Sequence, residues 1–433
     1  MDHRSTPLNI RFETLGCRTN TAETSLMAEV VVGGGHTLVD DVKDADFLVL
    51  NSCTVTHGAD RDVGKLIRRA IRANPTVRVV VTGCLPVAYP NHTVLEGVDV
   101  CLKGNDPQAL LAALGGGASF GVDSTKARRF VLEHRGGMSR VHVKIAEGCD
   151  HRCSYCIVPD ARGAPRSESP DSIFREVCDA SEAGFEEVVL TATHVLKYGR
   201  DLSPSRSLMW LMKQLEEAVP GPRFRLSSME PGPAMEEVVG HLLESPRWCR
   251  HLHLAIQNGS DGVLARMRRP YRFETVEREL ERLSGRDPAL GVGMDVIVGF
   301  PGETDAEFQE NLERLQGLPF HYLHVFPYSP RKGTEAASMR PLVPSQIVKT
   351  RSALLRELSQ QRRREFAEGF VGKEMEVLVE TVLPNRFTGI TDNYLRVTGS
   401  GSNLKKGKLA KVLVRKAIDG VLWVNQPWEE ERP

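Results

Sequence analysis

The feature that most constrains this chain is a regular alternation of short apolar runs with amphipathic stretches of helical periodicity. Between residues 137 and 330 there are six apolar runs of strand length, at residues 141–147, 186–193, 224–229, 251–257, 292–299 and 322–328. Successive β/α units build a parallel sheet, and six of them favour a partial or open (β/α)6 barrel over a complete eightfold one. The active groups of such a barrel gather at the carboxyl ends of its strands.

The same alternation precedes this region, in residues 9 to 104. Apolar runs at 9–16, 45–53 and 77–85 enclose helical stretches at 21–32 and 58–73, which predicts a smaller parallel α/β unit. Residues 114–124 hold three consecutive glycines and no sustained period, so we expect a linker there.

The pattern of apolar and polar residues changes near the carboxyl terminus. Residues 345–369 have a helical pattern, and the runs 373–383, 387–397 and 408–424 alternate with turn residues as short antiparallel strands do. The sequence therefore predicts an α/β protein with a small terminal all-β barrel. Its three domains would cover residues 8–118, 135–365 and 369–430, in keeping with a length of 433 residues.

Charge and hydropathy narrow the possible partners. The 56 basic residues balance the 56 acidic ones, so a polyanion would have to be bound by a local patch rather than by the overall field. No apolar signal segment follows the first charges, and eighteen apolar residues nowhere run together. We expect a soluble cytoplasmic protein with no membrane association; the sequence does not indicate its oligomeric state.

Three closely spaced cysteines carry the strongest chemical signal. Cys149, Cys153 and Cys156 form a C-x3-C-x2-C cluster directly after the predicted strand 141–147. A closed structural zinc site uses four protein ligands, whereas three thiolates leave one position open. A [4Fe-4S] cluster with one exposed iron fits that count, because soft thiolates suit iron–sulfur clusters.

A second group of cysteines is dispersed in the sequence. Cys17, Cys53 and Cys84 each follow, or end, one of the three apolar runs of the N-terminal unit. The carboxyl ends of parallel strands share one edge of a sheet, so these thiols are predicted to converge there. The other cysteines have no such placement, and we expect Cys178 to be a core residue of an amphipathic helix.

The C-x3-C-x2-C motif with Tyr155 before its last cysteine resembles the radical S-adenosylmethionine superfamily. The resemblance implies that the open iron chelates S-adenosylmethionine and that an electron from the cluster cleaves it to a 5′-deoxyadenosyl radical. It also implies an electron donor such as flavodoxin or ferredoxin.

Taken over nearly its whole length, the chain resembles the methylthiotransferases of that superfamily. The matching segments are Thr14 to Cys17, Asn51 to Thr56, Val81 to Cys84, Glu147 to Pro159, His251 to Leu254, Gln257 to Asp261, Asp295 to Thr304 and Leu323 to Arg331. The resemblance implies an N-terminal domain whose cysteines hold an auxiliary [4Fe-4S] cluster, a radical SAM core and a C-terminal TRAM domain. Such enzymes convert a C–H bond into C–S–CH3, using a methyl group from one S-adenosylmethionine and a radical from another.

The segments around Cys53 and from Val325 to Thr334 are most similar to the tRNA threonylcarbamoyladenosine branch, which acts on C2 of the adenosine 3′ to the anticodon. The partner implied is the tRNA anticodon stem-loop. Alternatives are a methylthiotransferase acting on isopentenyladenosine tRNA or on a protein residue, and a non-enzymatic zinc or iron–sulfur RNA-binding protein. The chain departs from the family at Leu85, Ala255 and Asn258.

Local basic patches give the RNA hypothesis an independent basis. From Arg396 to Lys416 there are seven basic residues and no acidic one. Lys405, Lys406, Lys408 and Lys411 are the predicted phosphate contacts in this stretch. Two further groups are Arg61, Lys65, Arg68, Arg69 and Arg72, and Arg266, Arg268, Arg269 and Arg272. His251 and His253 alternate on one predicted strand, and we assign neither a catalytic role.

Overall fold

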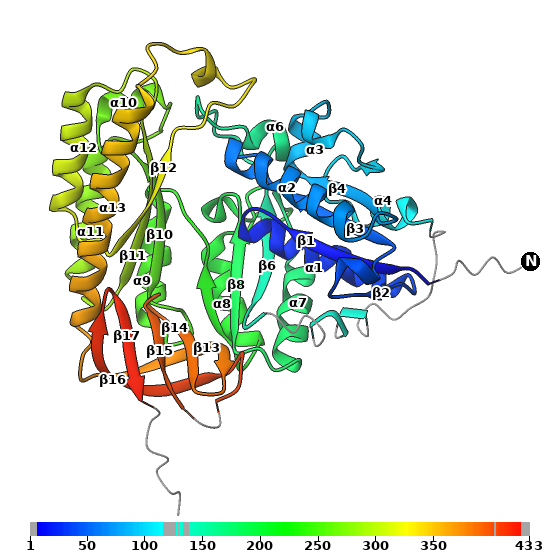
Figure 1. Cartoon of the computed structure of the whole chain (residues 1–433). Helices are drawn as coiled ribbons and strands as arrows, with labels where there is room; N and C mark the ends of the chain where they lie inside the picture. Colours follow the sequence, from blue (N-terminus) through cyan, green and yellow to red (C-terminus); the bar gives the residue numbers. More distant parts are fainter. Residues whose placement is uncertain (1–6, 116–126, 129, 133–137, 402–403, 426–433) are drawn as a thin grey trace, which may run out of the picture.

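The computed structural model describes residues 7–115, 127–128, 130–132, 138–401 and 404–425 (Figure 1). Most of the predicted linker at 114–124 lies outside these residues. The chain forms an N-terminal unit, a central unit and a C-terminal barrel, which correspond to the three domains that we propose. Of the helices that the structure describes, none has the length and apolar character needed to cross a lipid bilayer.

The N-terminal unit is a five-stranded parallel sheet with the order β2-β1-β3-β4-β5. Its strands are β1 (Asn9–Thr14), β2 (Thr37–Leu38), β3 (Phe47–Ser52), β4 (Arg78–Gly83) and β5 (Val100–Cys101), with helices α1 (Arg18–Gly33), α2 (His57–Ala73), α3 (Cys84–Ala88) and α4 (Pro107–Ala113). The strand order reverses between β1 and β3, and in such sheets ligands bind beside the carboxyl ends at that reversal. Every residue of β3 is buried, as its continuous apolar run predicts.

The central unit contains the six predicted parallel strands in chain order. They are β6 (Val141–Glu147), β8 (Glu187–Ala192), β9 (Arg223–Leu226), β10 (His251–Gln257), β11 (Gly291–Val298) and β12 (Tyr322–Pro327). The short β7 (Arg166–Ser167) is added antiparallel to β6. Only single bridges connect the β9 side to the segment around β10, including Met229 to Leu254, so the partial barrel consists of two sheets.

Helices cover the outer face of this partial barrel, as the crossover pattern predicts (Figure 1). They are α7 (Pro170–Glu182), α8 (Leu208–Ala218), α9 (Ala234–Glu244), α11 (Phe273–Ser284) and α12 (Asp305–Gly317), with the short α6 (Val158–Arg162) and α10 (Asp261–Arg266). The barrel strands and these helices share one apolar core, to which Leu190 and Met294 belong.

The C-terminal unit is a closed five-stranded barrel that follows the long helix α13 (Ser345–Glu368). Its strands are β13 (Glu374–Leu383), β14 (Arg386–Thr391), β15 (Arg396–Ser400), β16 (Leu409–Ile418) and β17 (Val421–Asn425), in the order β13-β14-β15-β17-β16. Turns split the predicted runs 387–397 and 408–424 into two strands each. The expectation of purely antiparallel pairing was wrong for β15 and β17, which pair parallel. A closed ring of five strands is odd-numbered, so its neighbours cannot all be antiparallel.

The turn between β14 and β15 fixes this barrel against the strands of the central unit. Arg225 is fully buried and donates hydrogen bonds to the backbone oxygens of Asp392 (2.8 Å) and Thr391 (3.1 Å). The ring of Tyr394 stacks on His251 with 4.3 Å between centroids. Tyr394 has a positive φ of 72°, a strained conformation that its surroundings maintain. The C-terminal barrel thus contributes side chains to the interior of the central unit.

Candidate functional site

The structure brings the dispersed cysteines of the N-terminal unit together. Cys17 follows β1 and precedes α1, Cys53 follows β3, and Cys84 follows β4. Burial, with a smaller contribution from the charge of neighbouring thiols, raises the pKa of Cys84 to about 12 and raises the pKa of Cys53. A Cβ at Gly16, the residue before Cys17, would lie 2.8 Å from Cys53 Cβ, so the loop that carries Cys17 packs against Cys53. We refer to Cys17, Cys53 and Cys84 as the auxiliary triad.

Gly83 controls how closely the strand ends within the auxiliary triad approach. Its φ is +91°, and a Cβ at this position would lie 2.3 Å from the carbonyl oxygen of Ser52. Any side chain would force β4 away from β3 and thereby separate Cys84 from Cys53. The glycine before Cys84 is a geometric requirement of the thiol arrangement.

The C-x3-C-x2-C cysteines lie on the loop after β6, and we refer to them as the radical triad. Gly148 precedes Cys149 with a φ of +76°, and a Cβ there would fall 2.0 Å from the carbonyl oxygen of Ala164. Burial raises the pKa of Cys156 to about 12. Thiols buried in this way bind metal only as thiolates, so the three soft donors suit an iron–sulfur cluster rather than a hard cation.

Arg269 contacts the radical triad directly. Its Nη1 donates to Cys153 Sγ at 3.2 Å, its Nη2 donates to the carbonyl oxygen of Ala255 at 3.0 Å, and it is ion-paired with Glu230. Hydrogen bonds to cluster sulfurs are one way in which a protein tunes a reduction potential. The departure at Ala255 leaves this backbone contact intact, because only a carbonyl oxygen is needed.

The basic group 266–272 is therefore not the uniform patch that its composition suggests. Arg269 is buried, Arg266 is paired with Glu307 at 2.8 Å, and Arg268 with Glu335 at 2.5 Å. Composition identified the positive charge but not the direction of each side chain. We do not retain this group as an RNA contact.

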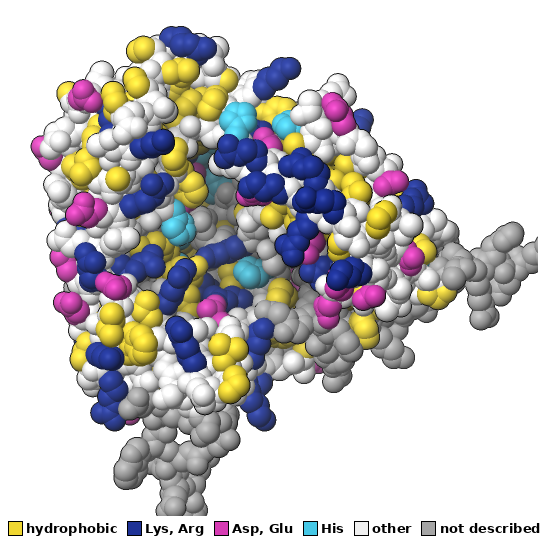
Figure 2. Space-filling view, viewed as in Figure 1, with side chains coloured by type: hydrophobic (Ala, Val, Ile, Leu, Met, Phe, Trp, Pro, Cys, Tyr) yellow, Lys and Arg dark blue, Asp and Glu magenta, His cyan; other side chains and the backbone are white. Residues whose placement is uncertain are grey.

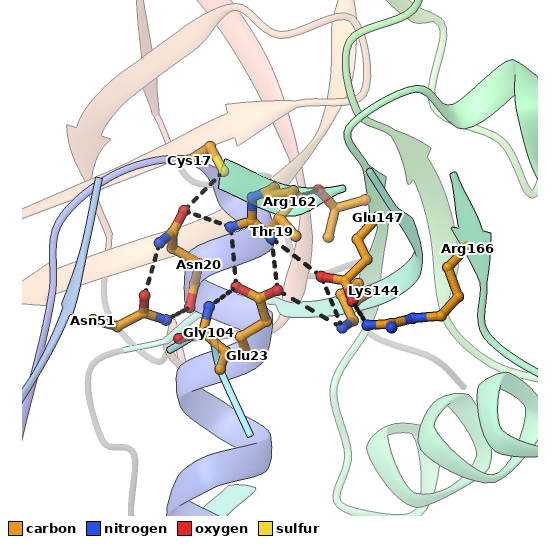
Figure 3. A network of polar contacts seen from close by, with 12 residues as sticks. Cys17, Thr19, Asn20, Glu23, Asn51, Gly104, Lys144, Glu147, Arg162 and Arg166 are labelled. Atoms are coloured by element: carbon orange, nitrogen blue, oxygen red, sulfur yellow. Dashed lines mark hydrogen bonds and ion pairs between the residues drawn. The ribbon is translucent and has the colours of Figure 1, made fainter. Parts of the chain in front are cut away.

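Arg162 connects the central unit to the auxiliary triad, and no sequence motif singles it out. It is the last residue of α6, which follows the radical triad, and its side chain is only 6% exposed. Its Nη1 donates to Glu23 at 2.7 Å and its Nη2 to Asn20 Oδ1 at 3.1 Å, and the same Asn20 oxygen accepts from Cys17 Sγ at 3.0 Å (Figure 3). A continuous chain of polar contacts thus runs from α6, which follows the radical triad in the sequence, to Cys17 of the auxiliary triad.

The charges around Arg162 explain why it is held there. Glu23 is buried, and Lys144 lies 3.7 Å from it. Burial lowers the pKa of Arg162, but Cys84 and Glu23 raise it well above the usual range, so the guanidinium stays charged. Figure 3 shows Glu147 and Arg166 continuing the network on the central unit. The network fixes the two units relative to one another at the site.

We expect Arg162→Met to lower the free energy of unfolding by about 3 kcal/mol. Removing one partner leaves Glu23 as a poorly compensated buried charge, and Lys144 offsets only part of that cost. Urea denaturation followed by circular dichroism measures the change. Arg166→Met is the matched control, because Arg166 is 75% exposed and its contact with Glu147 should contribute less than about 1 kcal/mol. Equal effects of both changes would contradict the role assigned to Arg162.

A pocket of about 630 Å³ adjoins the radical triad. His151, within the cysteine loop, lines it together with residues that follow the ends of neighbouring strands. These include His194, Lys197, Glu230 and Tyr271. The volume lies in the range of small-molecule sites, and the polar groups among its walls could orient a cofactor.

A second polar group lies among β10, β11 and β12. His253 Nε2 lies 2.7 Å from Asp295 Oδ1, and His324 Nδ1 lies 3.2 Å from the same oxygen. Burial raises the pKa of Asp295, but the hydrogen bonds with the two histidines outweigh it and lower the pKa to about 2. His251 instead contacts Tyr322 at 2.9 Å. The sequence analysis singles out both histidines of β10 but not the contact of His253 with Asp295. The available signal for Asp295 is that it is an acidic residue inside an apolar run.

The four predicted RNA-contacting lysines occupy different environments on the C-terminal barrel. Lys405, Lys406 and Lys411 are exposed. Lys408 is ion-paired with Glu186 at 3.2 Å and donates to the backbone oxygen of Gly184 at 2.8 Å, so it ties the barrel to the central unit. Ser402 and Asn403, within this basic stretch, lie outside the described residues.

The basic residues of α2 face solvent beside the opening between the N-terminal and central units. Arg61, Lys65, Arg68, Arg69 and Arg72 are all exposed. Figure 2 shows Lys and Arg side chains gathered around and within a hollow between these units. Of the three remaining cysteines, Cys178 packs partly against the central core, as expected, Cys249 is buried and Cys101 is exposed.

Two family models match the chain in the units described above. Residues 143–315 match the radical SAM superfamily, and residues 9–102 match the Uncharacterized protein family UPF0004. The chain is 36% identical to threonylcarbamoyladenosine tRNA methylthiotransferase MtaB of Bacillus subtilis (strain 168), with 94% of each chain covered. It is 35% identical to the protein of the same name from Aquifex aeolicus (strain VF5), covering 94% of this chain and 100% of that one.

More distant similarity extends to a related enzyme and to a solved structure. The chain is 30% identical to tRNA-2-methylthio-N(6)-dimethylallyladenosine synthase of Syntrophomonas wolfei subsp. wolfei, over 96% of this chain and 97% of that one. The radical S-adenosylmethionine methyltransferase TsrM from Kitasatospora setae, solved with cobalamin and a [4Fe-4S] cluster, aligns with a TM-score of 0.54 at 15% identity. That alignment covers 88% of this chain and 81% of the other, and it supports the fold.

Proposed function

This chain belongs to the radical S-adenosylmethionine methylthiotransferase family, and we propose that it replaces the C2 hydrogen of N6-threonylcarbamoyladenosine in tRNA with a methylthio group. The observation that carries the proposal is that the unit with the C-x3-C-x2-C loop contacts the auxiliary triad through Arg162 and Asn20, so the chain holds two cysteine triads in adjoining units. Relatives that match nearly the whole chain, from Bacillus subtilis and Aquifex aeolicus, bear the name of that activity.

The members of the radical SAM superfamily use S-adenosylmethionine and a [4Fe-4S] cluster. We assign that cluster to Cys149, Cys153 and Cys156 and place S-adenosylmethionine in the adjoining pocket of about 630 Å³. We assign a second [4Fe-4S] cluster to Cys17, Cys53 and Cys84. When bound, the two clusters and S-adenosylmethionine would supply the chemistry of the reaction. That chemistry is the reductive cleavage of S-adenosylmethionine and the provision of the sulfur and the methyl group of the product.

The chain's own residues orient these groups. Arg269 directs a charged hydrogen bond at Cys153 and so fixes the position of that sulfur. Asn20 accepts from Cys17 and is itself held by Arg162, so Cys17 of the auxiliary triad is positioned by a residue of α6, the helix that follows the radical triad. A shift of either unit would break this network, which gives the two triads one fixed spacing.

The substrate would be the tRNA anticodon stem-loop, bound beside the hollow whose rim carries the exposed basic residues of α2 (Figure 2). An electron donor such as flavodoxin or ferredoxin would reduce the radical-triad cluster. A tRNA substrate and such a donor are consistent with a cytoplasmic protein.

The lysines of the C-terminal barrel provide a test of RNA binding. We expect Lys405→Ala with Lys411→Ala to reduce the slope of log affinity against log salt by about one unit for each lost phosphate contact. Binding of an anticodon stem-loop across a salt series measures this. Lys408→Ala should change the slope less, because Glu186 already pairs with it. Identical slopes for the wild type and the double variant would remove the barrel from the RNA site.

The proposed activity can be reconstituted directly. Protein purified without oxygen should carry about eight irons and should convert tRNA containing N6-threonylcarbamoyladenosine to its 2-methylthio form when given S-adenosylmethionine and a reductant. Zinc in place of iron would indicate a structural RNA-binding protein. Conversion only of isopentenyladenosine tRNA, or only of a protein, would assign the chain to another branch.

A further inference from the structure

A second cavity, distinct from the pocket beside the radical triad, lies where all three units meet. Its volume is about 310 Å³. Arg18 from the N-terminal unit, Arg140 and His324 from the central unit, Arg363 from α13, and Tyr394 and Arg396 from the C-terminal barrel are among its lining residues. Because each unit contributes a cation, the cavity exists only in the assembled chain. We refer to it as the arginine pocket.

Most of the positive charge in the arginine pocket is not neutralised by the protein. Arg140 pairs with Glu187 at 3.0 Å and also with Glu380, which is the pocket's one lining carboxylate. Within the described part of the chain, no carboxylate lies within ion-pairing distance of Arg18, Arg363 or Arg396. Arg18 and Arg363 are half-buried here and Arg396 is exposed, so two partly desolvated guanidinium groups without a carboxylate partner give the cavity a positive potential that favours an anion.

The donors in the pocket are also incompletely used. Arg18 Nη2 donates to the Tyr394 hydroxyl at 3.1 Å, while Arg18 Nη1 is buried without a hydrogen-bond partner. The pKa of Arg363 is lowered by burial and by the charge of Arg396, and Tyr322 and Tyr394 offset only part of that lowering. A buried unpaired donor costs about 1–3 kcal/mol, so Arg18 Nη1 is available to donate to a group that enters the pocket.

The position of the pocket relates it to the site of chemistry. Arg18 directly follows Cys17 of the auxiliary triad, and His324 belongs to the group formed with His253 and Asp295. The pocket is a recess among the three units rather than a convex surface, and its volume suits a group of amino-acid size. Backbone phosphates are more easily met by the exposed residues of α2 and of the C-terminal barrel.

We propose that the arginine pocket binds the carboxylate of the threonylcarbamoyl side chain of the substrate adenosine and thereby selects that substrate. This inference rests on the proposed function. A carboxylate can accept the paired N–H donors of a guanidinium in a bidentate geometry. An uncharged N6 substituent, such as a dimethylallyl group, would bury these cations without a partner and would be rejected. The other source of an anion here is a backbone phosphate of the same RNA.

The test compares three anticodon stem-loops that differ only at the target adenosine, which is unmodified, dimethylallylated or threonylcarbamoylated. Affinities are measured with the cluster-loaded protein and with Arg363→Gln. We expect Arg363→Gln to weaken binding of the threonylcarbamoylated RNA by about 10- to 100-fold, because a charged hydrogen bond is lost. Binding of the other two RNAs should change by less than about threefold, since their bases carry no anion to place there.

Arg364→Gln is the matched control, because Arg364 is the next residue on α13, is exposed, and lies 3.8 Å from Asp419. It should leave all three affinities unchanged, and the iron content of each variant reports that the fold is intact. An equal loss for all three RNAs would overturn the proposal in favour of a backbone phosphate. No loss for any RNA would overturn it in favour of an unused pocket.

One further RNA separates this proposal from the proposed function. In it the threonyl carboxylate is converted to its neutral amide. If the wild type binds the acid form more tightly than the amide form and Arg363→Gln binds both equally, the result supports the assignment of the carboxylate to the arginine pocket. Conversion of the threonylcarbamoylated RNA without such discrimination would sustain the proposed function and reject the pocket. Failure to convert that RNA at all would reject the proposed function itself.

Discussion

Replacing Cys153 with Ala should reduce cleavage of S-adenosylmethionine to background. Cys153 is the buried member of the radical triad, and it accepts the hydrogen bond from Arg269. Its loss leaves two thiolates for a four-iron cluster, too few to hold the cluster in a form that binds S-adenosylmethionine at an open iron. Production of 5′-deoxyadenosine under reducing conditions, without RNA, measures the effect.

The control for this change is Cys178→Ala. Cys178 lies on α7, packs partly against the central core and belongs to neither triad. It should retain full 5′-deoxyadenosine formation and full iron content. Undiminished cleavage by Cys153→Ala would show that the C-x3-C-x2-C loop does not hold the reactive cluster.

Replacing Cys53 with Ala should abolish methylthiolation while leaving the cleavage of S-adenosylmethionine intact. Cys53 lies in the N-terminal unit at the end of β3, so the radical triad keeps all of its ligands. We expect iron to fall from about eight to about four atoms per chain, 5′-deoxyadenosine still to form, and the methylthiolated nucleoside to be absent. Mass spectrometry of the reaction and an iron assay measure these outcomes together. Full yield of product from Cys53→Ala would mean that the three strand-end thiols hold no cluster needed for the reaction.

Much of the fold could be predicted because its signals are local. The strand at 251–257 matches the structure to the residue and the helix at 345–369 matches it within one residue, since a change of period or a turn residue marks each end. The short strand β7 and the helix α6 were not predicted, because two to five residues carry no period. The parallel pairing of β15 with β17 follows from closure of an odd-numbered ring, which no single strand reveals.

The residues of the candidate site also differ in whether a local sequence signal reveals them. The auxiliary triad could be predicted because topology alone brings the ends of parallel strands together. Arg162 and Arg18 could not, because their importance depends on side-chain direction and on contacts between units. Arg162 Nη2 reaches Asn20, and Arg18 Nη2 reaches Tyr394, each across a long interval of sequence. A lone arginine in a sequence gives no sign of such a partner.

Charge reasoning succeeded where side chains face solvent and failed where they turn inward. The basic residues of α2 are exposed, as a charged helix face predicts. Arg269 was counted with a similar group, but it is buried against Cys153. The arginine pocket was not predicted for the same reason, since Arg18, Arg363 and Arg396 are far apart in the sequence and meet only where the three units join.

The measurement that tests the central claim most directly is mass spectrometry of tRNA nucleosides from cells lacking this protein. The account predicts that 2-methylthio-N6-threonylcarbamoyladenosine disappears and that N6-threonylcarbamoyladenosine accumulates in its place. Re-expression of the wild-type chain should restore the methylthio nucleoside, whereas Cys53→Ala should not. An unchanged nucleoside profile in cells lacking the protein would contradict the assignment of this substrate.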